Sequence, residues 1–510
     1  MSKALDWIKD LIAVVTTENL GESEKKGYFF ELENKYNEFS NEEKKEIRNI
    51  ISRFEYNDLI FVLSSIIQYM NVDVFGEDIM KYLIKGDFDW LTGAMLELQV
   101  AVKVKGQYAK KRIFHKKNIT RFDKLLKLDY PYVKVENRNK KRIAIMTEHV
   151  LNELHAPTKV VLDFAYVLQE YMGYEVMIFA CPCDARLPYD LWHNPVSINV
   201  NPEYKDFDML INHKGKILRG YQVNMTQSSP KEYSMMLSMI YYWNPLFVFE
   251  MGAINPIMDV MNKFTTVVAM SMSIGCPISE GEILFRLDKT DDELEQIYSN
   301  SLNRGQKQIF ADGKIPVVVK KSNKENNRSD FGLSDDQYLI AIVGNRLDVE
   351  VDDECVQLMK EILKQVHNVA FLIIGEVDTL KNKFTDTIFD ERVLYLGFCE
   401  DLMGVYNIVD LYMNPQRKGG GFSSSMAIQA GVPVVTLPNC DVAYNVGEEF
   451  VVENYEQMKE IICKYATDSV FFEKQKEQAE VNSKRNSQDS MVKYVENAIG
   501  KIISEIESEK

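Results

Sequence analysis

The sequence has no long run of hydrophobic residues. A helix that spans a bilayer needs about 20 consecutive apolar residues, and no stretch of this 510-residue chain approaches that length. The N-terminus, MSKALDWIKDLIAVV, is amphipathic and contains Asp6 and Asp10, whereas a secretory signal has an uncharged apolar core. These absences argue against a membrane-spanning protein, and we expect the chain to be cytoplasmic.

Cysteines are few and scattered. The sequence contains seven, with no CxxC pair. The closest two, Cys181 and Cys183, lack the two further thiol or imidazole ligands that a zinc site needs at zinc-finger spacing. An odd number of dispersed thiols is typical of a reducing compartment. We therefore expect reduced core thiols and predict no metal site.

The chain also lacks an excess of positive charge. Its formal net charge of -16 at pH 7 argues against a nucleic-acid partner, because phosphate recognition needs a basic surface. Residues 103–127 depart from this average, with ten lysines and arginines against one acid, Asp123. Two interpretations stay open: a solvated helical face, or a peripheral dock for an acidic partner or for anionic lipid at the inner membrane leaflet.

What is present indicates several domains. The chain is 46% hydrophobic and 27% charged, which is typical of a globular protein, and its length predicts about three domains. Residues 1–138 follow helical spacing throughout, and Ser40 with Glu43 forms a capping box. We predict an all-α domain over this range.

From Lys141 the hydrophobic period changes. A buried strand at 142–146, a helix at 160–171 and a strand at 175–180 form a βαβ unit, which predicts a parallel sheet. Further strands are predicted at 209–212, 246–250 and 265–270. We therefore predict a Rossmann-like α/β domain over residues 139–318.

A second βα series follows the polar segment 320–330. Its predicted strands are 338–343, 369–374, 392–396 and 411–413. This series predicts a second Rossmann-like domain over residues 319–485 and a bracing helix over 486–510. Two doubly wound domains in tandem would face a common cleft, and ligands bind at the carboxyl ends of such strands.

The most informative stretch is NPQRKGGGFSSSMAIQAGVPVVTLP, residues 414–438. A Gly/Ser-rich loop here runs into a short helix and then into a predicted strand at 432–437. Glycines let the backbone approach an anion, and a helix N-terminus adds unpaired N–H groups and a positive dipole end. This order predicts a diphosphate site.

Three segments of the second domain resemble the donor half of GT-B glycosyltransferases: VGNRLD at 343–348, YLGFCEDLMGVYNIVDLYMNP at 395–415, and the Gly/Ser loop. Within that fold the loop resembles the O-GlcNAc transferase group and the bacterial HMW1C-type protein glycosyltransferases, which also place an all-α domain ahead of the two halves. The resemblance implies a glycosyltransferase with a nucleotide-sugar as its cosubstrate. We expect that donor to be a UDP-sugar, and we expect the enzyme to need no cofactor.

The resemblance also implies which residues bind the donor. The first loop supplies a cation, the second frames the base, and the third holds the phosphates and ribose. Arg346 and Lys418 are the cations that we expect to neutralise the diphosphate, since no DxD motif occurs in these loops. The full predicted set is Asn345, Arg346, Phe398, Lys418, Gly420, Gly421, Ser423, Ser424 and Ser425.

The predicted catalytic residues lie after the first strand of the first domain. His155, His149 and Glu148 follow that strand, and His155-Ala-Pro-Thr resembles the acceptor loop of the same group. These side chains suit the deprotonation or orientation of an acceptor group. An equal alternative is that His155 merely precedes a helix capped by Thr158.

Two departures bear on mechanism. Lys418 and Met426 stand where retaining enzymes carry a glutamate pair, which favours inversion. Met426 also replaces the acid expected for the ribose, and Glu448 or Glu449 are candidate substitutes. The predicted function is hexose transfer to a protein side chain. The alternatives are transfer to a capsular, cell-wall or lipid-linked glycan, and a non-catalytic partner subunit or glycoprotein chaperone. The sequence leaves the oligomeric state open.

Overall fold

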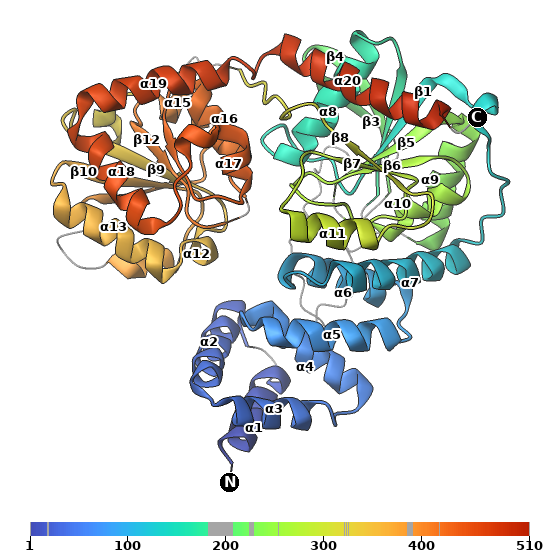
Figure 1. The fold of residues 1–510 in the computed structure, drawn as a ribbon, viewed down its shortest axis with the longest axis horizontal. Coiled ribbons are helices and arrows are strands. Elements are labelled where there is room, and N and C mark those ends of the chain that lie inside the picture. Colours follow the sequence, from blue (N-terminus) through green and yellow to red (C-terminus); the bar gives the residue numbers. More distant parts are fainter. Residues whose placement is uncertain are drawn as a thin grey trace. The chain divides into compact units, whose positions relative to one another are not determined.

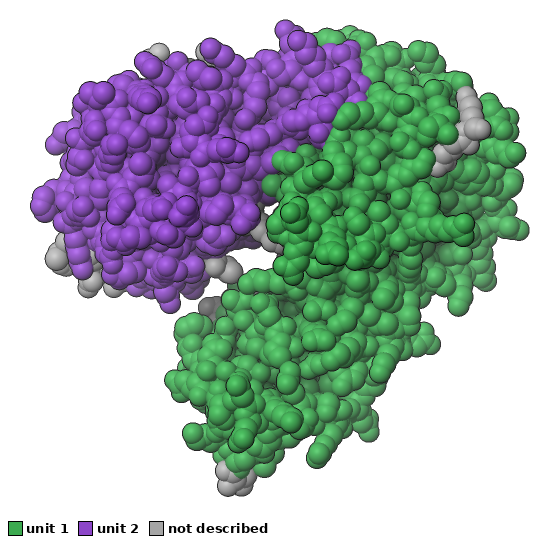
Figure 2. Space-filling view, in the orientation of Figure 1, with its two compact units in different colours: residues 1–310, 500–510 green, residues 311–499 purple. Residues whose placement is uncertain are grey.

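The protein forms two compact units in a computed structural model, residues 1–310 with 500–510 and residues 311–499 (Figure 2). Each unit is considered by itself. The predicted domain boundaries after 138, 318 and 485 stay predictions. The structure describes residues 2–17, 20–181, 208–223, 229–252, 254–320, 322, 324, 326–384, 391–417 and 419–508.

Unit 1 begins with helices that pack around one apolar core (Figure 1). The predicted capping box is confirmed, because Ser40 Oγ accepts from the Glu43 N–H and Glu43 accepts from the Ser40 N–H at 2.8 Å. None of the described helices is both long and apolar enough to cross a membrane. The bounds are α1 Lys3–Thr16, α2 Glu22–Glu38, α3 Asn41–Ile51, α4 Tyr56–Tyr69, α5 Asp73–Lys85, α6 Trp90–Lys103 and α7 Tyr108–Leu126.

The rest of unit 1 is an eight-stranded sheet with order β3-β4-β2-β1-β5-β6-β7-β8. All neighbours are parallel except β3 and β4, which form an antiparallel hairpin at one edge. Strands β4, β7 and β8 are additional to the predicted ones. The bounds are β1 Asn139–Thr147, β2 Glu175–Ala180, β3 Met209–His213, β4 Lys216–Gln222, β5 Pro245–Met251, β6 Val267–Met270, β7 Ile283–Arg286 and β8 Lys307–Phe310.

Helices and short 3-10 turns connect these strands. Asp291 caps the helix after β7 by accepting from the Leu294 N–H at 2.9 Å, while the Thr290 hydroxyl donates to Glu295 at 2.8 Å. The bounds are η1 Val135–Asn137, α8 Ala156–Glu170, α9 Pro230–Trp243, α10 Pro256–Val260, η3 Met261–Lys263, α11 Asp292–Asn300 and α20 Gln488–Glu507, whose last turns return to unit 1.

A buried ionic cluster connects the helices of unit 1 to its sheet domain. The His115 ring on α7 lies 2.5 Å from Glu97 Oε1 on α6 and 2.5 Å from Asp259 Oδ2 on α10. Asp259 also accepts from Ser279 Oγ at 2.6 Å and from the Glu280 N–H at 3.0 Å. The helices and the sheet domain therefore share buried polar bonds as well as apolar contacts.

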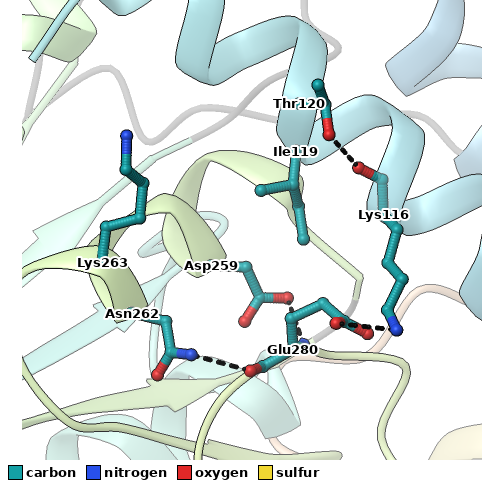
Figure 3. Close-up of a pocket in the computed structure, with 7 residues that line it drawn as sticks. All are labelled: Lys116, Ile119, Thr120, Asp259, Asn262, Lys263 and Glu280. Carbon is teal, nitrogen blue, oxygen red and sulfur yellow. Dashed lines mark hydrogen bonds and ion pairs between the residues drawn. The ribbon is translucent and has the colours of Figure 1, made fainter. Parts of the chain in front are cut away.

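Several residues of the basic region 103–127 form contacts at this same junction between the helices and the sheet domain. Lys111 is buried and donates to Val104 O at 2.6 Å, and Arg112 contacts Glu280 at 3.0 Å. Lys116 also pairs with Glu280, at 3.4 Å. Figure 3 shows Lys116 and Glu280 beside a cavity of about 340 Å³ between α7 and α10. A large share of the positive charge thus has partners within the unit.

Unit 2 is a five-stranded parallel sheet with order β11-β10-β9-β12-β13. Apolar clusters cover both of its faces. The strands are β9 Tyr338–Val343, β10 Val369–Ile374, β11 Val393–Gly397, β12 Leu411–Met413 and β13 Val434–Val435. The helices are η4 Arg328–Phe331, α12 Leu347–Glu350, α13 Asp353–Gln365, η5 Leu380–Phe384, α15 Leu402–Tyr406, α16 Gly421–Gln429, α17 Asp441–Val446, η6 Glu448–Phe450, α18 Tyr455–Thr467 and α19 Ser469–Ser483.

Strand β13 is shorter than the predicted strand at 432–437. Only Val434 and Val435 pair with β12. Thr436 instead exchanges backbone bonds with Phe450 and Val452, so the chain turns away from β12 at once. The hydrophobic run is long because these residues are buried, not because all of them belong to a strand.

Candidate functional site

The strand order of unit 2 places a switch point between β9 and β12. From β9 the chain builds β10 and β11 on one side, then returns to build β12 and β13 on the other. The loops that follow β9 and β12 therefore diverge at the carboxyl edge of the sheet, where open α/β sheets bind their ligands. The predicted donor residues lie in these loops and after β11.

Two glycines let the loops after β9 and β10 pass very close to each other. A Cβ built on Gly375, which has φ +134°, would lie 1.9 Å from the Gly344 carbonyl oxygen. No side chain fits at Gly375, and the absence of one lets the backbone after β9 pass directly against the loop after β10 at the sheet edge. Asn345 and Arg346 then emerge as exposed side chains.

Arg346 has a fixed anionic partner. Its Nη2 lies 2.8 Å from Glu350 Oε1, and its Nε donates to the same oxygen at 3.0 Å. The side chain stays 65% exposed, so one face of the guanidinium remains open. A Cβ added to Gly419 would lie 3.2 Å from Arg346 Nη2, so this cation lies next to the Gly/Ser loop.

The loop itself ends in a helix N-terminus. Gly420 is the N-cap of α16 with φ +96°, and the first intrahelical bond runs from the Ser424 N–H to Gly420 O at 3.0 Å. The amides of residues 421–423 thus precede the helical ladder and lack partners within it. These N–H groups and the helix dipole make this terminus attractive to an anion.

Two of the three serine hydroxyls of α16 have hydrogen-bond partners, while the buried Ser425 Oγ has none among the described residues. Ser423 Oγ donates to Gly420 O and lies 3.0 Å from the Tyr412 hydroxyl. Ser424 Oγ donates to Gly421 O at 3.0 Å and is fully buried, and Ser425 is 1% exposed. Of the three, Ser423 alone is half-buried, so the backbone is better placed than the hydroxyls to meet a ligand.

Other predicted donor residues differ in position. Phe398 follows β11 with 52% of its surface exposed, and its N–H donates to Glu376 at 3.4 Å. Lys418 lies outside the residues that the structure describes. Met426, where an acid was expected for the ribose, is 7% exposed and packs in the core. Of its candidate substitutes, Glu449 is held by Gln478 of α19.

Unit 1 has its own switch point, between β1 and β5. The loop after β1 carries the three predicted catalytic residues. The rings of His149 and His155 lie 4.9 Å apart, and Glu148, which precedes His149 in the sequence, is buried. His155 is the N-cap of α8, where its Nδ1 lies 2.9 Å from Thr158 Oγ1. The structure therefore brings the two histidines together and also gives His155 the capping position.

Burial makes both histidines poor proton binders. Burial, with a smaller contribution from the neighbouring His149, lowers the pKa of His155 to about 4. Burial also lowers the pKa of His149. Both rings are thus neutral at pH 7 and can accept a proton from an acceptor group.

A second carboxyl lies at the same edge of the sheet. Glu250 ends β5 opposite Met146 and is 3% exposed. Burial raises the pKa of Glu250 well above its usual range, and the charges of Asp259 and Glu148 add to this. Ser279 Oγ donates to Glu250 at 3.3 Å. Sequence reasoning missed this residue, because a lone glutamate at the end of an apolar strand gives no signal.

Arg417 and Glu350 were missed as well. Arg417, in the loop after β12, is 7% exposed, and its Nη1 lies 2.8 Å from Glu350 Oε2. The spacing of Arg346 and Glu350, four residues apart, is a helical pairing signal that could have been noticed. For Arg417 the sequence offers no comparable signal.

Comparison with known proteins indicates the class of protein. Residues 323–485 match the family of glycosyl transferases group 1. The whole chain aligns with the whole of a Thermobaculum terrenum O-GlcNAc transferase mutant at 12% identity and a TM-score of 0.56. No curated protein sequence matches.

Two further solved structures are similar over somewhat less than three quarters of the chain. A Rickettsia africae glycosyltransferase covers 72% of this chain and 99% of its own, at 12% identity and a TM-score of 0.49. An Anabaena protein in complex with UDP and glucose covers 71% and 99%, at 12% identity and a TM-score of 0.48.

Two Rossmann-like α/β domains with a helical region ahead of them define the GT-B fold, and the predicted fold is confirmed. The second of these domains carries the group 1 glycosyltransferase sequence. The protein is accordingly a glycosyltransferase that resembles O-GlcNAc transferase in fold.

Proposed function

We propose that the protein transfers a hexose-type sugar from a UDP-linked donor to a protein side chain. The observation that carries the donor half is the exposed Arg346 guanidinium beside the N-terminus of α16, at the switch point of unit 2. A leaving nucleoside diphosphate develops negative charge, which this cation and the helix amides would neutralise. Phe398 offers an exposed aromatic face for the base.

The loop after β1 would act on the acceptor. In the proposed step the acceptor oxygen or nitrogen forms a bond to the anomeric carbon, its proton passes to the His155 or His149 imidazole, and the sugar–phosphate bond breaks. The electron pair leaves with the nucleoside diphosphate. Attack from the opposite face inverts the anomeric carbon. A positioned base contributes about 10²–10⁴-fold to such a step.

The proposed reaction uses no cofactor and no metal. Support comes from the cationic and amide groups at the donor site, which are alternatives to a metal for neutralising a diphosphate. The groups of carboxylates, histidines and cysteines that the structure describes include no cluster suited to a metal ion. Addition of EDTA is therefore expected to leave the rate unchanged.

Incubation with a panel of UDP-, GDP- and ADP-sugars tests the donor proposal. We expect mass spectrometry to detect released UDP and a glycosylated polypeptide, and titration calorimetry to detect UDP binding that Arg346→Ala weakens. Lys459→Ala, which removes a surface cation of unit 2 paired with Glu361 and Glu456, is the matched control. Absence of heat with all three nucleotides at millimolar concentration would disprove the proposal.

A protein acceptor is preferred to a lipid-linked glycan. In the basic region that suggested a membrane dock, Lys111 and Arg112 are buried and bonded within unit 1, and Lys116 forms an ion pair with Glu280. Sedimentation with vesicles that contain anionic lipid distinguishes the two routes. We expect the protein to stay in the supernatant at physiological salt, as a cytoplasmic enzyme would. Salt-sensitive sedimentation would favour the glycan route.

A further inference from the structure

Glu350 holds two arginines at once. Its Oε1 faces Arg346, with Nη2 at 2.8 Å and Nε at 3.0 Å, and its Oε2 faces Arg417 Nη1 at 2.8 Å. The Glu350 side chain is 13% exposed, against 65% for Arg346 and 3% for Arg417. The carboxylate therefore lies between an open cation and a buried one.

Arg417 is held in place by hydrogen bonds from all three of its guanidinium nitrogens, Nη1 being the one that contacts Glu350. Its Nε donates to Asn414 Oδ1 at 2.8 Å, and its Nη2 donates to Val343 O at 2.6 Å and to the Tyr412 hydroxyl at 3.1 Å. A buried guanidinium requires a paired anion. Glu350 supplies that anion, so one of its oxygens is fixed by the fold.

Further hydrogen bonds connect Arg417 to the first turn of α16. The Tyr412 hydroxyl that Arg417 contacts lies 3.0 Å from Ser423 Oγ, which donates to Gly420 O at 3.0 Å. Tyr406 donates to Ser423 O at 2.9 Å. A continuous hydrogen-bonded chain thus runs from Glu350 to the helix terminus proposed to meet the diphosphate.

We propose that Glu350 is a positioning residue for nucleotide-sugar binding, which fixes the Arg346 guanidinium in place before the diphosphate arrives. This inference rests on the proposed function. A free arginine on a four-residue helix would lose side-chain entropy on binding, whereas Arg346 is already oriented by two bonds to an anchored carboxylate. Arg346 Nη2 lies beside Gly419, and the N–H groups that do not face Glu350 are left for the phosphate oxygens.

A double-mutant cycle read by calorimetric titration with UDP tests the positioning role. Glu350→Gln removes the charge but keeps the shape, and we expect it to weaken UDP binding about tenfold. Arg346→Ala should weaken binding at least as much, and the double variant should be no weaker than Arg346→Ala alone. Glu361→Gln, which removes a surface carboxylate paired with Lys459 in the same unit, should bind as the unchanged protein does.

Arg346→Lys tests the same idea without disturbing Arg417. Lysine keeps the charge but cannot make the paired bonds to Glu350. We expect it to lose most of the affinity that Arg346→Ala loses, with an unchanged melting temperature and a raised KM for the nucleotide-sugar. This variant decides the matter if Glu350→Gln fails to fold.

Three results would overturn the inference while leaving the proposed function intact: UDP binding by Glu350→Gln at full strength or tighter, independent effects that multiply in the double variant, or full affinity in Arg346→Lys. Failure of the unchanged protein to bind any nucleotide would instead overturn the proposed function, and this inference with it.

Discussion

Among single residues, the histidines after β1 have the clearest experimental signature. Because burial and His149 depress the pKa of His155 to about 4, its imidazole stays neutral and able to accept a proton well below pH 6.5. We expect kcat/KM to be level from about pH 8 to pH 5 and to fall only as His155 is protonated near pH 4. A loss with a midpoint near 6.5 would contradict a catalytic role for this ring.

Substitution of the same rings gives a second test. His155→Ala should lower kcat by about 10²–10⁴-fold if the imidazole is the base. His149→Ala should move the acid limb of the pH profile upward, because it removes a ring that disfavours protonation of His155 once it is itself protonated. The control is His367→Ala, at an exposed position of unit 2, which should retain full activity. Equal losses in all three variants would indicate general destabilisation.

Some residues of the candidate site could be predicted from the sequence, and others could not. Arg346 was predicted because it follows a recognisable strand, in a loop that resembles the one that supplies a cation in GT-B enzymes. Arg417 and Glu350 stand 67 positions apart, and only the order of β9 and β12 brings them together. Met426 stands where the resemblance expects an acid for the ribose, and its side chain packs in the core.

At the scale of elements, buried parallel strands were the most predictable part. The strands at 175–180, 338–343, 369–374 and 411–413 were predicted to the residue, since they are short, apolar and bounded by polar loops. Strand β8, with sequence KQIF at the sheet edge, was missed because one side of an edge strand tolerates polar residues.

The loop before α16 predicts a specific sensitivity to substitution. Gly420 has φ +96°, and an added Cβ would lie 2.7 Å from Arg417 Nη2 and 3.0 Å from Asn414 Oδ1. We expect Gly420→Ala to destabilise unit 2 by about 1–3 kcal/mol and to weaken UDP binding in the same titration.

The matched control is Gly500→Ala. Gly500 lies within α20 with nothing near an added Cβ, so alanine there should be neutral or should stabilise by up to about 1 kcal/mol. Urea unfolding monitored by circular dichroism measures both variants. A Gly420→Ala protein as stable as the Gly500→Ala protein would show that the loop is not constrained as described.

For the molecule as a whole, the ionic cluster around His115 predicts cooperative stability of unit 1. Burial alone would lower the pKa of His115, but Glu97 and Asp259 outweigh burial and raise it well above 6.5. His115→Gln would leave two buried carboxylates without a cation. We expect a loss of about 3–5 kcal/mol in the free energy of unfolding, measured by urea titration.

The pH dependence of that loss has a definite sign. A raised pKa in the folded state stabilises fully below about pH 6.5, and the stabilisation fades as pH rises through the folded value. The difference between the unchanged protein and His115→Gln should therefore narrow under alkaline conditions. Lys81→Gln, which removes an exposed ion pair, should cost less than about 1 kcal/mol at every pH.

The bond between His115 and Asp259 also bears on how the chain is made. Asp259 follows His115 by 144 residues, which a ribosome working at about 5–20 residues per second needs roughly 7–29 s to add. During that interval the emerging helices hold the His115–Glu97 pair without its second carboxylate, and the helical surface that belongs against α10 is uncovered. Synthesis that halts before Asp259 would release an unfinished protein with an exposed ionic surface, a natural substrate for chaperones and proteases.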